Sequence, residues 1–275
     1  MQNAGIDALG LNWRYLAFEV HPDNLRGALE GARLMGFLGL NLTVPHKLLA
    51  LEMLDVLDES ARTWGAVNTV RFEGRDPAGN WRPLREFENL PQQMRSHGFN
   101  TDADAIPRAI REGVGVELSR ARVLVLGAGG AGRTAALKLA SENLAEIFLV
   151  NRTLSKATAV AEEIAMRQPG LPVRIGYPSG TVDLVVNATS LGLKTDDNLP
   201  FDEGQFALSK AGGAYDMIYR PAETPFLKLA KAAGCRAANG LGMLLYQGAT
   251  ALEIWSGQPP PIEEMRRALE KNVYG

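Results

Sequence analysis

Apolar residues in the second half of the chain follow two alternating spacings. Continuous apolar runs, typical of buried strands, occur at 122–126, 146–150, 182–188 and 213–218. Between the first three runs, residues 133–143 and 155–167 have apolar positions at helical spacing. This alternation predicts an α/β fold of the Rossmann type, a doubly wound parallel sheet with helices on its faces.

The first half of the chain shows a similar alternation. Residues 13–20 are rich in aromatic and β-branched side chains and predict a strand, and a helix should begin at Pro22. Further strands are expected at 37–42 and 65–72, with a helix from about residue 46, which points to another mostly parallel sheet. Residues 73–99 are polar and punctuated by Pro and Gly, and they predict a long excursion with a hairpin at Ala78-Gly79-Asn80.

Two α/β domains follow from these two series. The chain should cross between them near residue 102, where a helix is expected, and again near residue 239. A long apolar helix at 240–257 either packs back on the first domain or bridges the two. We therefore predict an N-terminal α/β domain formed by 1–102 plus 239–275 and a Rossmann domain at 103–238.

The composition narrows the class of protein. The 275 residues are 46% hydrophobic and carry a formal net charge of −2, which fits a globular protein with an ample core. A balanced charge gives no reason to expect nucleic acid or a membrane as a partner, and no run reaches the roughly 20 apolar residues that span a bilayer. A single cysteine, Cys235, and three scattered histidines predict no metal site and fit a cytoplasmic location. The partner should be a small molecule, and monomer and homodimer both remain open.

A glycine-rich loop separates the strand at 122–126 from the helix after it. The loop consists of Gly127, Ala128, Gly129, Gly130, Ala131 and Gly132. Gly127 permits a tight turn, Gly129 lets the backbone approach a pyrophosphate, and Gly132 allows close packing of helix and strand. The helix N-terminus offers free N–H groups to phosphates. The loop predicts a dinucleotide site, and a turn without a ligand is the alternative.

The residues after the strand at 146–150 indicate which dinucleotide binds. An NAD site usually has Asp or Glu here to bind the ribose hydroxyls. This chain has Asn151, Arg152 and Thr153, with Lys156 one turn further on. Because a guanidinium binds a 2′-phosphate through paired charge-assisted hydrogen bonds, we expect NADP(H) rather than NAD(H). A solvated surface charge is the alternative for Arg152.

Three polar clusters stand at predicted segment ends in the first domain. Lys47 lies in the first turn of a helix, where the helix dipole disfavours a cation. Asn68 ends one strand, and Asn100, Thr101 and Asp102 stand where the chain crosses between domains. Ligands of open α/β sheets bind beyond the carboxyl ends of the strands, so these clusters predict a binding site.

Several short motifs are spread along the chain. In order they read NLTVPHK, GAVNTV, NTD, GAGGAG, NRT, NATSLG, YDMIYRPAETPFL and NGLGMLLYQG. In this order and context they resemble the shikimate dehydrogenase (shikimate/quinate dehydrogenase) family from the first residues to about residue 257. The resemblance implies NADP-dependent reduction of 3-dehydroshikimate to shikimate in chorismate and aromatic amino acid biosynthesis. It also implies a cleft between a substrate-binding N-terminal domain and an NADP-binding Rossmann domain.

The resemblance also implies roles for individual residues. Lys47 and Asp102 look like the catalytic pair, since an ammonium can protonate a developing alkoxide while a carboxylate orients it. Substrate contacts are implied for Thr43, Asn68, Asp102, Tyr219 and Gln247, and walls of the cofactor pocket for Thr189, Ser190, Met217, Gly240 and Met243. Some of these roles have an alternative. Thr43 could only satisfy backbone groups, Gln247 could only cap the seam between the domains, and Met243 could be part of the core. For Asn41, a substrate contact and support of the loop both remain open.

The chain departs from the family pattern at its start and in one insertion. The usual opening strand and its serine pair, which bind the substrate carboxylate, do not precede the first helix, and we expect a misassigned start or a truncated chain rather than a natural rearrangement. The loss of that strand should expose sheet edges and apolar surface. The excursion at 73–99 is longer than the family hairpin and could cover the cleft, bind a partner or be inert.

Other functions remain open from the sequence. Quinate or aminoshikimate dehydrogenases of the same family differ in a single substituent of the substrate. A methylenetetrahydrofolate dehydrogenase-like protein also uses a lysine, but the NTD and YQG motifs argue against it. A catalytically impaired NADP-binding relative is the non-enzymatic alternative.

Overall fold

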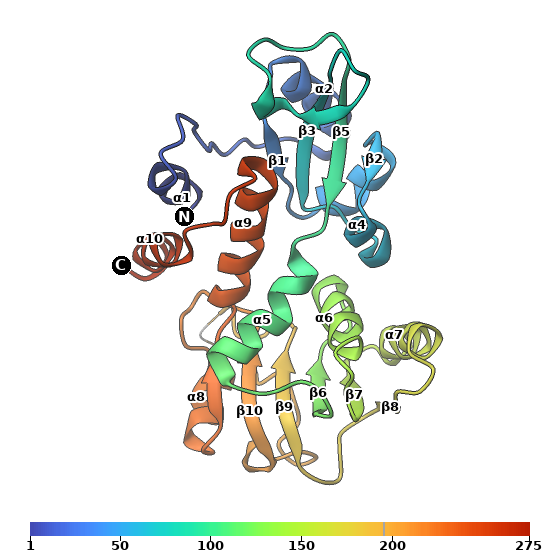
Figure 1. The fold of residues 1–275 in the computed structure, drawn as a ribbon. Helices are drawn as coiled ribbons and strands as arrows, with labels where there is room; N and C mark the ends of the chain where they lie inside the picture. Colours follow the sequence, from blue (N-terminus) through green and yellow to red (C-terminus); the bar gives the residue numbers. More distant parts are fainter. Residues whose placement is uncertain (195) are drawn as a thin grey trace. The chain divides into compact units, whose positions relative to one another are not determined.

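The structure, a computed structural model, describes residues 1–194 and 196–275 (Figure 1). It divides into two compact units. Unit 1 comprises Met1–Asp102 and Leu245–Asn272, and unit 2 comprises Ala103–Leu244 and Val273–Gly275. Within the described ranges, every helix is too short or too polar to cross a membrane.

Unit 1 is built around a sheet of five strands. Its strand order is β1-β3-β5-β2, with β4 paired to β3. The elements are α1 (Gln2–Ala8), α2 (Leu25–Leu34), β1 (Gly39–Asn41), α3 (His46–Leu49), β2 (Val56–Leu57), α4 (Glu59–Trp64), β3 (Thr69–Arg75), β4 (Trp81–Pro83), β5 (Met94–Phe99), most of α9 (Leu241–Ser256) and most of α10 (Ile262–Tyr274).

The expectation of a mostly parallel sheet is wrong for unit 1. β3 pairs antiparallel with β1, β4 and β5, and only β2 and β5 are parallel. The reason lies in the excursion at 73–99, which folds into β4 and the inner strand β5 instead of remaining irregular. The predicted hairpin is confirmed, because Arg75 pairs with Trp81 around a turn in which Gly79 has φ +90°.

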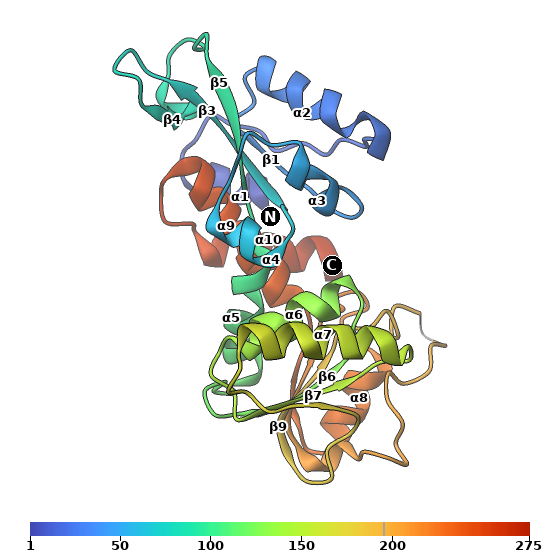
Figure 2. The same cartoon turned by 90° about the vertical axis from the view of Figure 1, so that its right-hand side faces the viewer.

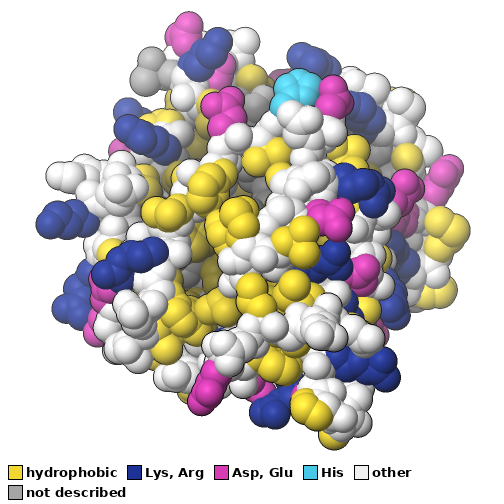
Figure 3. Space-filling model, turned by 90° about the horizontal axis from the view of Figure 1, so that it is seen from above, with side chains coloured by type: hydrophobic (Ala, Val, Ile, Leu, Met, Phe, Trp, Pro, Cys, Tyr) yellow, Lys and Arg dark blue, Asp and Glu magenta, His cyan; other side chains and the backbone are white. Residues whose placement is uncertain are grey.

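The predicted strand at 13–20 is also wrong. These residues form no strand, and they are held through side chains: Tyr15 Oη donates to Asn41 Oδ1 at 3.0 Å, and Asn3 exchanges hydrogen bonds with the Tyr15 backbone. A strand needs a partner for its backbone groups, and residues 13–20 do not pair with β1, the end strand of the sheet that this tyrosine contacts. Leu16 and Phe18 are 64% and 63% exposed. Figure 3 shows hydrophobic side chains gathered near the centre of the surface seen from above, with charged ones around them.

The two faces of the unit 1 sheet differ in chemistry. Val70 and Phe72 of β3 join the hydrophobic core with residues of α2. Because side chains alternate along a strand, Arg71 and Glu73 point to the opposite face. There, Glu73 is only 2% exposed and accepts hydrogen bonds from Arg71, from Arg95 at 2.7 Å and from His97 at 3.1 Å.

This cluster predicts a loss of stability in acid. Burial alone would raise the pKa of Glu73, but the hydrogen bonds from His97, Arg71 and Arg95 lower it to about 2. Because the folded-state pKa lies below the ordinary value, the cluster stabilises the fold above about pH 4.5, by on the order of 3 kcal/mol, and loses this contribution as the pH falls towards 2.

We therefore expect Glu73→Gln to lower the melting temperature at pH 7 by several degrees and to flatten its decline between pH 5 and pH 3. Thermal unfolding followed by circular dichroism over this range is the measurement. Glu264→Gln, which removes an exposed ion pair with Arg267, is the control and should change the melting temperature little. Equal pH profiles for Glu73→Gln and the unaltered chain would contradict the assignment.

Unit 2 contains a six-stranded parallel sheet with the order β11-β10-β9-β6-β7-β8. Its elements are α5 (Asp102–Val114, whose first residue belongs to unit 1), β6 (Arg122–Leu126), α6 (Gly130–Ala140), β7 (Glu146–Val150), α7 (Leu154–Arg167), β8 (Val173–Ile175), β9 (Val182–Asn187), β10 (Ala211–Asp216), α8 (Pro225–Ala232) and β11 (Arg236–Ala238). Chain order reverses between β6 and β9, which is the switch point where ligands of doubly wound sheets bind.

Both faces of this sheet are covered. Leu124 and Leu126 of β6 pack in one hydrophobic cluster with Phe226 of α8. Val123 and Val125 point to the other face and are also fully buried. Figure 2 shows α6 and α7 side by side over one face of the sheet. The predicted doubly wound fold is confirmed, and the strands at 122–126 and 146–150 have the predicted bounds.

The sequence patterns overlooked several short or terminal elements. α8, α10, β2, β8 and β11 were not expected from the spacing of apolar residues. The three strands have only two or three residues each, too few to show a period. α8 nevertheless has a readable start, since Thr224 caps Leu227 N and Pro225 occupies the first helical position.

Candidate active site

Lys47 and Asp102 meet in unit 1. Lys47 Nζ lies 2.7 Å from Asp102 Oδ2, and the side chains are 27% and 14% exposed. The pair is therefore shielded but reachable from solvent. An ammonium group in this position can donate a proton to a ligand oxygen, and the carboxylate can orient the ammonium and accept a hydrogen bond from a hydroxyl.

Backbone contacts hold both members of the pair. Lys47 lies in α3, and its carbonyl oxygen accepts a hydrogen bond from the N–H of buried Val67 at 2.9 Å. Asp102 begins α5, and its N–H donates to Asn100 Oδ1 at 3.1 Å. Asn100 is itself anchored, because its Nδ2 donates to Ala66 O at 3.0 Å. The carboxylate thus stands at a helix N-terminus, where a negative charge is stabilised.

Asn68 lies in the same unit in a buried polar network. Its Oδ1 accepts the Thr101 N–H at 2.8 Å, and its Nδ2 donates to Thr101 Oγ1 at 2.9 Å. The Nδ2 also donates to Gln247 Oε1, at a longer 3.4 Å. Two of the predicted substrate contacts, Asn68 and Gln247, are thereby brought together, and Asn68 is bonded directly to Thr101, the residue before Asp102.

The remaining predicted substrate contacts are placed differently. Thr43 is exposed in the turn before α3, and its carbonyl accepts the His46 N–H at 2.8 Å. Tyr219 belongs to unit 2 and is 37% exposed. Asn41, for which substrate contact and loop support were both open, donates to Asn68 O and Thr69 Oγ1 and so supports the neighbouring strand.

The glycine loop of unit 2 lies between β6 and α6. Gly127 has φ +106°, and a Cβ on Gly132 would lie 2.3 Å from Gly127 O, so the close helix–strand approach predicted for Gly132 is present. At Gly129 and Gly130 an added Cβ would meet open space. The loop, which includes Ala128 and Ala131, therefore leaves room for a ligand at the N-terminus of α6.

Residues 151–156 follow the carboxyl end of β7, next to this loop. Asn151 Oδ1 accepts the Ala128 N–H at 2.9 Å, and Asn151 Nδ2 donates to Thr153 O at 2.8 Å. Arg152 and Lys156 are exposed on either side of Thr153, the residue that directly precedes α7. Two cations thus stand near the glycine loop, where an anionic ligand group would be attracted.

The ends of β9 and β10 carry the other residues predicted for the cofactor. Met217 N donates to Asn187 O at 2.9 Å, and a Cβ on Gly240 would lie 2.2 Å from Met217 O, so only glycine fits there. Thr189 Oγ1 donates to Asn187 Oδ1 at 2.8 Å. Ser190 is exposed, and Met243 is half-buried in the first turn of α9.

Asp216 is a buried residue that sequence reasoning missed. It accepts hydrogen bonds from Thr224 Oγ1 at 2.6 Å, Asn187 Nδ2 at 3.0 Å and Ile218 N at 3.0 Å, and so ties the loops after β9 and β10 together. Burial raises the pKa of Asp216, although these hydrogen bonds act to lower it. Asp216 could have been identified from the sequence, because a carboxylate at the end of an apolar strand is unusual enough to mark a polar site.

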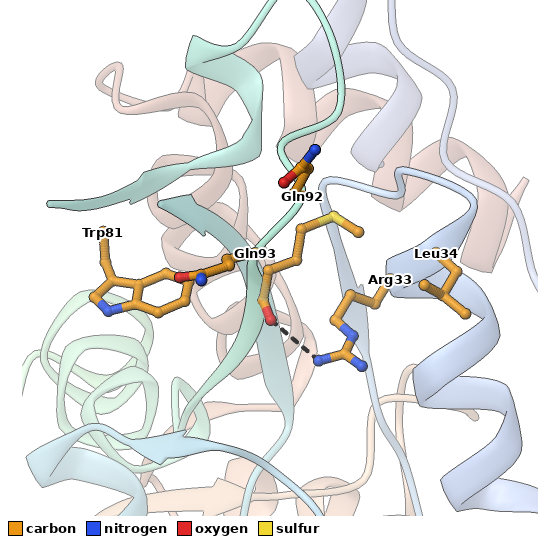
Figure 4. A pocket seen from close by; sticks show the side chains of 6 residues that line it. Arg33, Leu34, Trp81, Gln92 and Gln93 are labelled. Atoms are coloured by element: carbon orange, nitrogen blue, oxygen red, sulfur yellow. Dashed lines mark hydrogen bonds between the residues drawn. The ribbon is translucent and has the colours of Figure 1, made fainter. Parts of the chain in front are cut away.

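A separate pocket of about 330 Å³ opens on unit 1 (Figure 4). Arg33 Nη1 donates to Met94 O at 3.1 Å in its wall. The lining residues are Arg33, Leu34, Trp81, Gln92, Gln93 and Met94. None of the predicted site residues lines it, although four of its residues belong to the excursion at 73–99.

Three family models match the chain. The shikimate dehydrogenase substrate binding domain matches residues 1–70, shikimate / quinate 5-dehydrogenase matches residues 108–190, and the shikimate 5'-dehydrogenase C-terminal domain matches residues 240–270. The matches cover parts of both units.

Individual relatives match over nearly the whole chain. A shikimate dehydrogenase (NADP(+)) of Methanopyrus kandleri is 38% identical over 99% of this chain and 90% of its own length. The shikimate 5-dehydrogenase of Thermus thermophilus, solved with NADP(H) and shikimate, is 35% identical with a TM-score of 0.77 over 98% of this chain and 92% of its own. A 5-ketofructose reductase of a Gluconobacter species, solved without ligand, is 33% identical with a TM-score of 0.80 over 98% of this chain and 92% of its own.

Proposed function

The chain belongs to the shikimate dehydrogenase family, and we propose from this that it catalyses the NADP-dependent, reversible reduction of 3-dehydroshikimate to shikimate. This reaction belongs to chorismate and aromatic amino acid biosynthesis. The observation that carries the proposal is the contact of Lys47 Nζ with Asp102 Oδ2, because ketone reduction needs a proton donor held beside the carbonyl oxygen.

Each residue of the pair has one part in this reaction. Lys47 donates a hydrogen bond to the ketone oxygen and then its proton as negative charge develops there. Asp102 keeps the ammonium in place and accepts a hydrogen bond from a neighbouring substrate hydroxyl. In the direction of oxidation, Lys47 takes the proton back. Asn68, Thr43, Tyr219 and Gln247 are proposed to contact the substrate.

The residues of unit 2 fit NADP(H). The open space at Gly129 and Gly130 accommodates the pyrophosphate at the N-terminus of α6, and the exposed Arg152 and Lys156 suit the 2′-phosphate. When bound, the nicotinamide supplies the hydride for the ketone carbon. We assign substrate binding to 1–102 plus 239–275 and NADP(H) binding to 103–238. Thr189, Ser190, Met217, Gly240 and Met243 are proposed as pocket walls.

Steady-state oxidation of NADPH with 3-dehydroshikimate tests the proposed function. Quinate with NAD and 5-ketofructose with NADPH are the comparison substrates, the second because of the 5-ketofructose reductase relative. We expect kcat/KM to be at least about a hundredfold higher for 3-dehydroshikimate, the scale on which an unpaired substrate hydroxyl is rejected. Binding of NADPH without turnover of any substrate would favour a catalytically impaired relative.

We also propose that the enzyme acts in the cytoplasm as a monomer or a homodimer. The single buried cysteine, Cys235, fits a reducing compartment. Size-exclusion chromatography with light scattering separates the two assembly states.

Arg152→Ala should raise the KM for NADPH by at least about tenfold, since a charged hydrogen bond to the 2′-phosphate is lost, and should change the KM for NADH little. Steady-state kinetics with both cofactors is the measurement. Arg174→Ala is the matched control, because Arg174 is an exposed arginine of unit 2 paired with Glu146. Equal changes for the two cofactors in Arg152→Ala would refute the role of Arg152.

A further inference from the structure

A chain of side-chain hydrogen bonds runs behind Asn68 in unit 1. Tyr15 Oη donates to Asn41 Oδ1 at 3.0 Å, Asn41 Nδ2 donates to Thr69 Oγ1 at 3.0 Å, and Thr69 Oγ1 donates to Asn68 Oδ1 at 3.1 Å. Thr69 is 0% exposed and Asn68 is 1% exposed. Burial raises the pKa of Tyr15, which keeps its hydroxyl protonated as a donor.

The orientation of the Asn41 amide is determined by a backbone group. Asn41 Nδ2 lies 3.1 Å from Asn68 O, and a carbonyl oxygen can only accept a hydrogen bond. The NH₂ group must therefore face Asn68 O and Thr69, and Asn41 Oδ1 must face Tyr15. Both protons of the Asn41 amide are used inside the protein.

This orientation in turn determines where the proton of Thr69 goes. Because Asn41 Nδ2 donates to Thr69 Oγ1, one lone pair of the hydroxyl is occupied. Asn68 Oδ1 can only accept and, at 3.1 Å, is nearer than the Thr101 hydroxyl at 3.4 Å, so we assign the single hydroxyl proton of Thr69 to it. The Thr101 hydroxyl, 3.4 Å from Thr69 Oγ1 and 3.2 Å from Asn68 Oδ1, completes the buried cluster.

Asn68 is thus held at its oxygen by Thr69 and by the Thr101 N–H, at 2.8 Å. One proton of its NH₂ group is taken by Thr101 Oγ1 at 2.9 Å. The other points to Gln247 Oε1 over a long 3.4 Å, the weakest bond of the set. This second N–H is the one that a substrate oxygen can take over at little cost.

We propose that Thr69 is a positioning residue for the Asn68 amide, and that Tyr15 and Asn41 act through it. The inference rests on the proposed function, which assigns Asn68 to the substrate. Thr69 keeps the Asn68 oxygen turned inward, so that the second N–H is presented to the substrate. Without the hydroxyl, the amide loses one of the donors that define its orientation.

Thr69→Val replaces the hydroxyl by a methyl group of similar volume. We expect it to raise the KM for 3-dehydroshikimate about fivefold to tenfold, the scale of one hydrogen bond. The KM for NADPH should stay within about twofold, and kcat should fall less than the KM rises. Thr69→Ser, which keeps the hydroxyl, should restore the KM to within about twofold of the unaltered chain.

A double-mutant cycle with Asn68→Ala separates positioning from general structural support. If Thr69 acts through Asn68, Thr69→Val should add no further rise in KM in the Asn68→Ala background; an additive rise would overturn the inference. Should Thr69→Val fail to fold, Tyr15→Phe decides, since it removes the outer donor only, and an unchanged KM in that variant likewise overturns it. Absence of turnover by the unaltered chain contradicts the proposed function itself, and this inference with it.

Discussion

Lys47→Ala should lower kcat for the reduction of 3-dehydroshikimate by at least about two orders of magnitude. The variant removes the proton donor of the ketone oxygen, and the loss of a general acid typically costs about 10² to 10⁴ in rate. Asp102, which lies 2.7 Å from the ammonium, orients the lysine in the proposed mechanism and is not its proton donor. Steady-state kinetics at saturating NADPH is the measurement.

Binding of NADPH should survive in Lys47→Ala, because the residues assigned to the cofactor belong to unit 2 whereas Lys47 belongs to unit 1. Fluorescence titration with NADPH checks this. Lys271→Ala, at an exposed position of α10, is the matched control and should retain the kcat of the unaltered chain. Turnover by Lys47→Ala like that of the unaltered chain would remove the lysine from the mechanism.

The regular part of the fold could be predicted from the spacing of apolar residues. β6 and β7 are buried on both faces, so they are continuous apolar runs with sharp ends. The antiparallel sheet of unit 1 could not be predicted in this way. Whether two strands are parallel depends on which strands become neighbours in the sheet, and the spacing of apolar residues does not show that. The polar excursion at 73–99 conceals an inner strand, β5, whose alternate residues form the Glu73 cluster.

The candidate site was predictable to the extent that its residues stand in recognisable motifs. Lys47 and Asp102 are 55 residues apart. The position of their clusters at segment ends predicted a binding site, and the motifs around them indicated that the two side chains form a pair. Thr69 lies inside the same motif as Asn68 but gave no signal of its own, because threonine is common in strands. Its role depends on which atoms around it can only accept hydrogen bonds, and that is visible only in three dimensions.

Asp102→Asn should lower kcat/KM for shikimate oxidation by about a hundredfold. Asparagine keeps the size of the side chain and an oxygen acceptor for Lys47. It removes the negative charge that attracts the Lys47 ammonium, which lies 2.7 Å from Asp102 Oδ2. The effect should appear in both kcat and KM, because the carboxylate is proposed to orient the lysine and also to bind a substrate hydroxyl. Initial rates over a range of shikimate concentrations at saturating NADP measure it.

A nearby aspartate supplies the control for this variant. Asp104 lies in the same first turn of α5, is 76% exposed and pairs with Lys138, so Asp104→Asn changes the charge of the helix start without touching Lys47. Asp104→Asn should retain kcat/KM within about twofold. Because the two residues act as a unit in proton transfer, Lys47→Ala combined with Asp102→Asn should have the same kcat as Lys47→Ala alone, while its KM still rises through the lost contact with the substrate hydroxyl. If the two losses in kcat instead multiply, the carboxylate works independently of the lysine in the chemical step, and the shared role proposed for the pair is wrong.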